Sequence, residues 1–415
     1  MKALVFEQWQ GGHYFNYLEC LVPRLASFCD EVVMAVTESA ATSAVFAEKL
    51  GKVAALPGVR IDCGVAIPRE RTSAAIRLRL GRNVVDAVVR NRPDYVFLPS
   101  ADEQILALPL LALCGARRHL RGVPIEAVLH YKGYTSRGHG RDGWLSALQR
   151  GLLQAGVFTH LNFVNFLQYE DAIGFPPPLG RLARAAGDPV PPSAPMSRDD
   201  ARRELGLPTD GRYVGMVGEL DLRKAIPEAL AAFRAAGLGT TDRFLLGGRL
   251  HESHRRLVRD AYEDLVRSGR LVVIDRYLSE SEFAACFAAV DVNCSVYHSF
   301  AGLSSVLLKG IAAGRTALTS DMGWSRAVVR RFRVGRTTST VVADFARNMR
   351  DALEESVDYR EDVAVQRFLE FHSIPNFVHG LTDRACRLAG KPPSSAVRTW
   401  PWVLEALPPE RRHLR

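Results

Sequence analysis

Hydrophobic and polar residues follow two patterns that alternate along the chain. Short apolar runs of about four to eight residues, rich in β-branched and aromatic side chains, are typical of buried strands. Between them, apolar residues recur every three or four positions, which is typical of amphipathic helices. This alternation predicts parallel sheets with helices packed on their faces. Strands are predicted at residues 2–6, 31–37, 59–65, 94–100, 124–131, 159–166, 213–220, 243–248, 271–278, 290–297 and 315–320.

Proline interrupts the alternation near the middle of the chain. Three consecutive prolines occupy 176–178, and four more lie between residues 187 and 195. Proline without periodic apolar residues is typical of a linker. The alternation then restarts with a helix that Ser197 is placed to cap. We therefore predict an α/β fold with two Rossmann-like domains, residues 1–180 and 197–374, joined by a linker at 181–196.

The composition is that of a folded globular protein. Apolar residues make up 47% of the chain and charged residues 24%, and no apolar stretch reaches the roughly 18 to 20 residues that cross a bilayer. The first residues are too short and polar for a signal peptide, so we expect a cytoplasmic protein. The seven cysteines include no C-x-x-C pair. No cysteine and histidine cluster has metal-ligand spacing, so we expect neither a bound metal nor a cofactor.

The net charge of +9 is concentrated in part between Arg69 and Arg92, where seven arginines accompany two acidic residues. This segment predicts an amphipathic helix with a basic face. Two interpretations stay open. The basic face is either a solvated surface, or a surface that binds an anionic partner. That partner would be the inner face of a membrane or an acidic acceptor. Nucleic acid is not expected as a partner, because aromatic residues are not interleaved with the basic ones.

The stretch from Val290 to Trp324 has the pattern strand, turn, helix, turn, strand. Ser304 and Ser305 are placed to cap the helix, and Gly314 to end it in a left-handed conformation. A helix that begins just beyond a strand presents unpaired N–H groups and the positive end of its dipole to an anion. Gly302 would let a ligand approach the backbone. The pattern indicates a phosphate site, although any α/β unit contains such turns.

This stretch resembles the donor-site segment of GT-B glycosyltransferases, particularly the retaining family-4 type. Asp291 and the run from Lys309 to Gly314 match positions of the family's sequence pattern. Both glutamates of the family's E-x7-E signature are replaced, the first by Ala301 and the second by Lys309. In the family, the first glutamate lies against the donor sugar and the second holds the ribose hydroxyls. The resemblance extends over roughly residues 1–390.

The resemblance implies an architecture and a reaction. Two domains would face each other across a cleft, and residues 375–415 would form a helix that returns to the first domain, followed by a tail. In that tail we expect Trp400 and Trp402 to pack loosely. The reaction implied is metal-independent, retaining transfer of a hexose-type sugar from a nucleoside diphosphate. The acceptor would be a glycan, a lipid-linked molecule or a small natural product.

The resemblance also assigns roles to residues near strand ends. Lys224 aligns with the family's phosphate-binding lysine, and Arg223 is a shifted candidate for its arginine. Arg276 and Tyr277 stand where the family contacts the nucleobase, and His130 stands where it contacts the transferred sugar. His130 is the predicted catalytic residue. The predicted donor-binding residues are Gly12, His13, Gly218, Arg223, Lys224, Arg276, Tyr277, Gly302, Leu303, Ser304, Ser305 and Lys309.

The acceptor side and the function itself admit alternatives. Asp102 and Glu103 follow a predicted strand and are placed to orient an acceptor hydroxyl. Loss of both signature glutamates also fits a GT-B-shaped pseudoenzyme that binds a nucleotide, a glycan or a protein partner without turnover. A third candidate, a sugar-nucleotide epimerase, would need cleft carboxylates that the sequence does not place.

Overall fold

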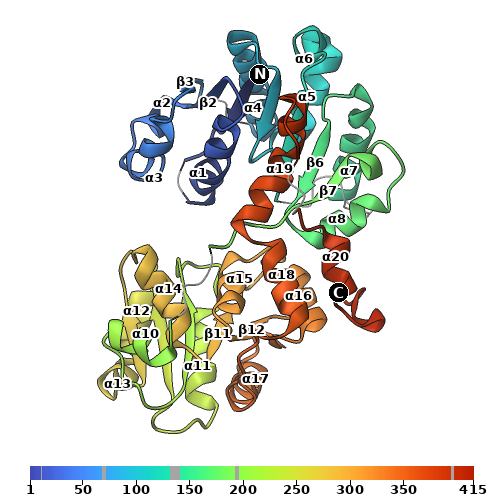
Figure 1. Ribbon diagram of the computed structural model, residues 1–415. Coiled ribbons are helices and arrows are strands. Elements are labelled where there is room, and N and C mark those ends of the chain that lie inside the picture. Colours follow the sequence, from blue (N-terminus) through green and yellow to red (C-terminus); the bar gives the residue numbers. More distant parts are fainter. Residues whose placement is uncertain (11, 68–71, 131–140, 192–195, 394–396) are drawn as a thin grey trace. The chain divides into compact units, whose positions relative to one another are not determined.

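The apolar runs predicted as strands pair into two parallel sheets, one in each half of the chain (Figure 1). The structure, a computed structural model, describes residues 1–10, 12–67, 72–130, 141–191, 196–393 and 397–415. The chain separates into two compact units. Unit 1 comprises Met1–Pro189 and Ile374–Trp400, and unit 2 comprises Val190–Ser373 and Pro401–Arg415.

Within the described residues, the sheet of unit 1 has seven strands in the order β3-β2-β1-β4-β5-β6-β7, and every pairing is parallel. The order reverses at β1 and β4, and such a reversal is where open α/β sheets bind ligands. The strands are β1 (Lys2–Phe6), β2 (Glu31–Thr37), β3 (Val59–Val65), β4 (Tyr95–Leu98), β5 (Ile125–Leu129), β6 (His160–Phe163) and β7 (Ala183–Ala185).

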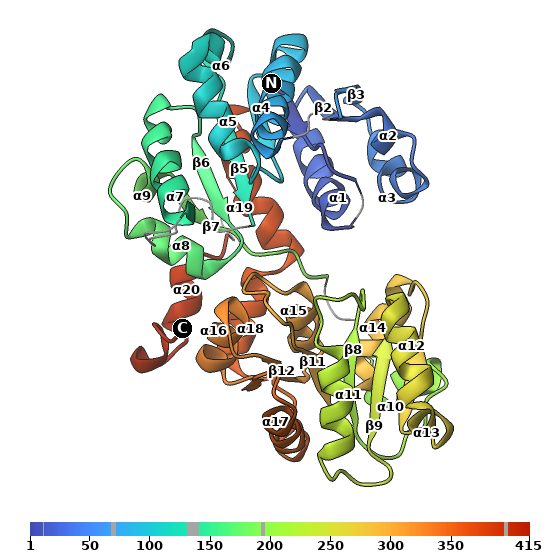
Figure 2. The same ribbon diagram turned by 180° about the vertical axis from the view of Figure 1, so that it is seen from behind.

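Helices cover the sheet of unit 1, and α1 packs beside both α3 and α19 (Figure 2). Because both faces of the sheet are covered, strands such as β4 and β5 are buried along their whole length. The helices are α1 (Gly12–Ala26), α2 (Glu38–Ala41), α3 (Ala44–Ala54), α4 (Ser73–Asn91), α5 (Gln104–Leu111), α6 (Arg117–Leu120), α7 (Arg141–Leu152), α8 (Phe166–Ile173), α9 (Leu179–Leu182) and α19 (Ile374–Leu388).

In the described part of unit 2, six parallel strands have the order β10-β9-β8-β11-β12-β13, which reverses at β8 and β11. The strands are β8 (Tyr213–Val217), β9 (Arg243–Gly247), β10 (Leu271–Ile274), β11 (Val292–Ser295), β12 (Thr316–Ser320) and β13 (Gly335–Thr338). The helices are α10 (Arg198–Glu204), α11 (Ile226–Ala235), α12 (Glu252–Ala261), α13 (Glu263–Arg267), α14 (Glu280–Ala289), α15 (Ser305–Ala312), α16 (Gly323–Phe332), α17 (Val342–Glu354) and α18 (Val363–Phe371). A last helix, α20 (Trp400–Glu405), begins at the end of unit 1.

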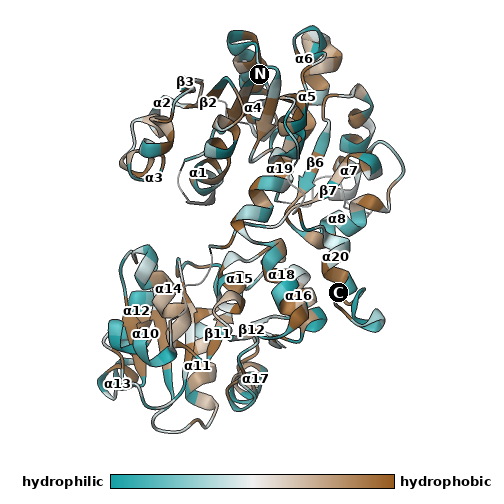
Figure 3. Ribbon diagram, in the orientation of Figure 1, coloured by the Kyte–Doolittle hydropathy of each residue, from teal (hydrophilic) through white to brown (hydrophobic). Residues whose placement is uncertain are grey.

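The structure confirms the predicted parallel α/β architecture and differs from the predicted elements in places. The basic segment forms α4 from Ser73 onward, while residues 68–71 lie outside the described ranges. The helical stretch between β9 and β10 is divided into α12 and α13, because the backbone leaves the helical region at Tyr262 (φ −132°). The helix α12 is largely hydrophilic (Figure 3). The strand β7 lies inside the segment predicted as a linker, and the boundary between the units follows at Pro189.

The tail packs more closely than expected. Trp400 is 1% exposed, its ring stacks on Phe166 with centroids 4.3 Å apart, and its indole N–H donates to Glu170 at 2.9 Å. The prediction of loose packing is therefore wrong for Trp400. Trp402 is half-buried, and the Arg367 guanidinium lies 4.8 Å from the centre of its ring.

Candidate nucleotide site in unit 2 and histidine network in unit 1

Two loops that follow β8 and β11 are hydrogen-bonded to each other in unit 2. The Ala225 N–H donates to the Val296 carbonyl at 3.1 Å, and the His298 N–H donates to the Arg223 carbonyl at 3.0 Å. Lys224 and Tyr297 form an antiparallel bridge between these two bonds. The pairing holds the predicted residues Arg223 and Lys224 beside the chain that leads into α15, at the reversal of strand order.

Lys224 is buried at the end of β8. Its side chain folds back so that Nζ donates to the Val217 carbonyl at 2.6 Å, and the residue is only 4% exposed. Gly218 has φ +105°, and a Cβ there would lie 3.5 Å from both Lys224 Nζ and a methyl group of Val306 in α15. Burial lowers the pKa of Lys224 to about 8. The ammonium therefore lies between the end of β8 and the first turn of α15, bonded to a carbonyl rather than to a carboxylate.

The first turn of α15 is capped as predicted. The Ser304 Oγ accepts from the Leu307 N–H at 3.3 Å and lies 3.2 Å from the Tyr297 hydroxyl. Ser304 is buried, whereas Ser305 is exposed and Leu303 is half-buried. Gly302 has a structural role, because a Cβ there would meet the Phe300 ring at 2.9 Å. The absence of a side chain at Gly302 thus accommodates an internal ring.

Lys309, in α15, packs against a ring of the neighbouring helix α14. Its Nζ is 4.6 Å from the centre of the Phe283 ring of α14, a cation–π contact. The Phe283 ring also lies 3.8 Å from the position of a Cβ on Gly218. Lys309, Phe283 and Gly218 are therefore neighbours. The Lys309 ammonium is thus held against an aromatic ring of the neighbouring helix α14.

The segment after β10 carries the residues predicted to contact a nucleobase. Arg276 Nη1 donates to Glu282 Oε2 at 2.8 Å, and this arginine, together with the Ser279 cap, lowers the pKa of Glu282 to about 2. Tyr277 is 84% exposed. The arginine is held in an ion pair, and the tyrosine ring is accessible for stacking.

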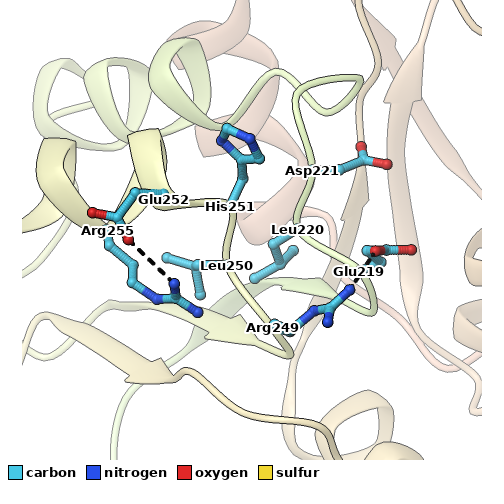
Figure 4. Close-up of a pocket in the computed structure, with 8 residues that line it drawn as sticks. All are labelled: Glu219, Leu220, Asp221, Arg249, Leu250, His251, Glu252 and Arg255. Carbon is cyan, nitrogen blue, oxygen red and sulfur yellow. Dashed lines mark hydrogen bonds and ion pairs between the residues drawn. The ribbon is translucent and has the colours of Figure 1, made fainter.

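A hollow of about 270 Å³ lies beside this segment, at the carboxyl ends of β8 and β9 (Figure 4). Arg249 points toward Glu219 at 3.1 Å, and Arg255 points toward Glu252 at 3.3 Å. No local sequence pattern marks this hollow, because its two walls are about thirty positions apart in the chain. Its lining residues are Glu219, Leu220, Asp221, Arg249, Leu250, His251, Glu252 and Arg255.

In unit 1, His130 at the end of β5 is surrounded by hydrogen-bond partners. Its Nδ1 lies 3.2 Å from Asp102 Oδ2, and its backbone N–H also faces the Asp102 carboxylate at 3.2 Å. Glu103, the other predicted acceptor residue, forms an ion pair with Arg77 of α4 at 2.9 Å. The two adjacent carboxylates therefore serve different partners: Asp102 holds His130, and Glu103 holds a helix.

Two further members of this network were missed from the sequence. His130 Nε2 lies 3.3 Å from the Tyr17 hydroxyl, and the two rings stack with centroids 5.6 Å apart. The Tyr17 hydroxyl donates to Asp188 at 2.6 Å. No local signal identifies these residues, because Tyr17 lies within the apolar pattern of a helix and Asp188 within a proline-rich segment.

The predicted donor-binding residues Gly12 and His13 are the first two residues of α1. The side chains at Gly12 and His13 are not described, and Gly11 lies outside the described residues. In the described part of the chain, no group of three or more His, Cys, Asp or Glu side chains is arranged to hold a metal ion. No described helix is both long and apolar enough to cross a bilayer.

Comparison with known proteins gives structural matches only. No protein-family model matches the sequence, and no curated protein matches it. HepE of Anabaena, solved in complex with UDP and glucose, superimposes with a TM-score of 0.62 at 15% identity, over 93% of this chain and 99% of that one. The chain has the GT-B fold.

Two further matches have the same GT-B architecture. Sucrose-phosphate synthase from Thermosynechococcus elongatus gives a TM-score of 0.65 at 14% identity, over 94% of this chain and 99% of that one. The lipopolysaccharide outer core galactosyltransferase WaaB gives a TM-score of 0.60 at 14% identity, over 92% of this chain and 99% of that one. At such identities the likeness establishes the fold, and the activity must be argued from the residues.

Proposed function

We propose that this GT-B protein is a glycosyltransferase that moves a hexose from a nucleoside diphosphate to a glycan, a lipid-linked molecule or a small-molecule acceptor. The transfer proceeds with retention and without a metal ion. The observation that carries the proposal is the buried Lys224 ammonium beside the capped amino terminus of α15. HepE, a structural neighbour solved with UDP-glucose, supports a nucleotide-sugar donor.

The proposed role of Lys224 follows from where charge develops. Departure of a nucleoside diphosphate places negative charge on its phosphate oxygens, and a fixed ammonium and helix N–H groups stabilise that charge in the transition state. Because burial lowers the pKa of Lys224 to about 8, an approaching diphosphate would favour the protonated form. Arg223, which is paired with Asp221 at 2.8 Å, adds positive charge next to Lys224.

The other predicted residues take supporting roles in this proposal. Tyr277 stacks on the nucleobase, and Lys309 adds positive charge near the phosphates where a glutamate would bind ribose. His130 contacts the transferred sugar, and Asp102 fixes the orientation of its ring. Because Glu103 is paired with Arg77, we propose that a group other than Glu103 orients the acceptor hydroxyl.

A binding protein without turnover is the second candidate, and one observation favours it. Both positions of the E-x7-E signature lack a carboxylate, and the Lys309 ammonium at the second is held over the Phe283 ring. Such a protein would bind a nucleotide through the same phosphate contacts and release no diphosphate.

The test is to incubate the protein with a panel of nucleotide sugars and glycan acceptors, and to measure both nucleotide binding and release of nucleoside diphosphate. Acceptor-dependent release supports the transferase, whereas binding without release supports the second candidate. Lys224→Ala should abolish release. The matched control is Arg256→Ala, which removes an exposed cation paired with Glu252 on α12. Absence of binding for every nucleotide and nucleotide sugar at millimolar concentration would refute both candidates.

A further inference from the structure

The chain passes between the two units at two places. The first crossing is at Pro189–Val190, and the second is at Ser373–Ile374. The unit 2 sides of the two crossings are bonded to each other: the Val190 N–H donates to the His372 carbonyl at 2.8 Å, and Val190 pairs in parallel with Ser373. His372 is fully buried, so this junction belongs to the packed interior of unit 2.

On the unit 1 side, one side chain contacts the segments next to both crossings. The Tyr17 hydroxyl donates to Asp188, which is two residues before Val190, at 2.6 Å. The Tyr17 ring packs against Phe377, three residues after Ile374, with centroids 4.7 Å apart. Tyr17 is only 2% exposed, so burial and these contacts fix the position of its hydroxyl.

The same hydroxyl lies 3.3 Å from His130 Nε2. A tyrosine hydroxyl has a single proton, and its shorter bond to the Asp188 carboxylate uses that proton. The oxygen can therefore only accept from His130, so that this contact is a hydrogen bond when Nε2 carries a hydrogen. Burial first, and then the Asp188 charge, hold the pKa of Tyr17 well above its ordinary value, so the hydroxyl stays protonated. The bond from Tyr17 thus fixes which nitrogen of His130 faces it and how the ring is turned.

We propose that Tyr17 and Asp188 are positioning residues that link the two crossings to His130, so that the orientation of this histidine depends on how both crossings are held. The proposal rests on the proposed transferase function only where activity is the readout. It adds a second determinant of His130 orientation to the Asp102 contact, and it gives the connecting segment a role beyond joining the units.

Kinetics provide the first test. Tyr17→Phe keeps the ring and its packing on Phe377 and removes only the hydroxyl. We expect kcat to fall about tenfold, the effect of one lost hydrogen bond, with the KM for donor changed less than about twofold. The control is Tyr213→Phe in unit 2, which removes a buried hydroxyl bonded to the Pro208 carbonyl at 3.0 Å. It should leave kcat unchanged.

Combined variants test whether Tyr17 acts through His130. In a His130→Ala background, Tyr17→Phe should lower kcat no further, because the group it positions is gone. Asp188→Asn should lower kcat in the wild type and add nothing in the Tyr17→Phe background. If the second substitution lowered kcat in either background by the same factor as in the wild type, the proposal would be overturned. A Tyr17→Phe enzyme with unchanged kcat would also overturn it.

A spectroscopic test does not depend on turnover. In ¹⁵N-labelled full-length protein, long-range ¹H–¹⁵N spectra report which imidazole nitrogen carries a hydrogen. We expect His130 Nε2 to carry a hydrogen in the wild type. The resonance of this nitrogen is assigned by its loss in His130→Ala, and we expect Tyr17→Phe to shift it. A His130 signal that Tyr17→Phe leaves unmoved would overturn the proposal even if the protein transfers no sugar. If the shift occurs without transferase activity, the proposed function fails and the coupling stands.

Discussion

Replacing Lys224 with methionine separates the electrostatic cost of the buried ammonium from its function. Burial lowers the pKa of Lys224 from 10.5 to about 8 in the folded chain. The unfolded chain therefore binds this proton at a higher pH than the folded chain does. As the pH falls from 10.5 to about 8, stability is lost, and the loss is constant at lower pH. At ~1.36 kcal/mol for each pH unit, the total is roughly 3 kcal/mol.

Methionine removes this cost and also the bond from Nζ to the Val217 carbonyl, which contributes about 1 kcal/mol. We expect Lys224→Met to stabilise the ligand-free protein at pH 7 by about 2 kcal/mol, and the gain to fall close to zero at pH 10, where most of the cost has disappeared. The same substitution should weaken nucleoside-diphosphate binding by about 1 to 3 kcal/mol, the usual contribution of a hydrogen bond to a charged group.

The assay is denaturant unfolding of the wild type and Lys224→Met at pH 7 and pH 10, together with titration of UDP at pH 7. A loss of stability at pH 7 would refute the argument from burial. A stabilised variant that binds UDP as tightly as the wild type would instead leave the burial argument intact and remove Lys224 from the nucleotide site.

Three other variants probe features outside the nucleotide site. Burial raises the pKa of Glu7 from 4.5 to about 8, so stability should fall as the pH rises from about 4.5 to about 8. Glu7→Gln should remove this slope and stabilise the protein by roughly 3 to 5 kcal/mol at pH 8, measured by denaturant unfolding. Trp400→Ala should destabilise unit 1 by roughly 3 to 5 kcal/mol in calorimetry, because it removes the ring stacked on Phe166. Asp291→Ala should cost unit 2 roughly 3 to 5 kcal/mol by the same measurement, since it leaves the buried Arg202 guanidinium without its carboxylate.

The features that the sequence predicted are those encoded by neighbouring residues. The strands at Glu31–Thr37 and Val59–Val65 match their predicted bounds, because a run of β-branched residues between polar ones is a local signal. The Ser304 cap and the left-handed Gly314 (φ +74°) were likewise identified from a few adjacent residues. Lys224 was singled out because its place just after a predicted strand matches the phosphate-binding lysine of the resembled family.

Contacts between distant segments could not be predicted in this way. Tyr17 and His130 are separated by 113 positions, and Tyr17 and Asp188 by 171. Neither contact can be recognised from the pattern of apolar residues. The strand β7 has the sequence Ala-Arg-Ala, too short and polar to be recognised, and it exists because β6 offers an open edge for pairing. The contact between Gly302 and the Phe300 ring likewise could not be placed from the sequence.

The most direct test of the nucleotide site is hydrogen–deuterium exchange of the full-length protein with and without saturating UDP. We expect slower exchange in residues 218–225 and 296–308, which pair with each other and flank Lys224 Nζ. We expect no change in α13 and α17, which serve as the internal control. Protection confined to other segments, with exchange unchanged in both of these loops while UDP is bound, would contradict the assignment of the diphosphate to Lys224 and the first turn of α15.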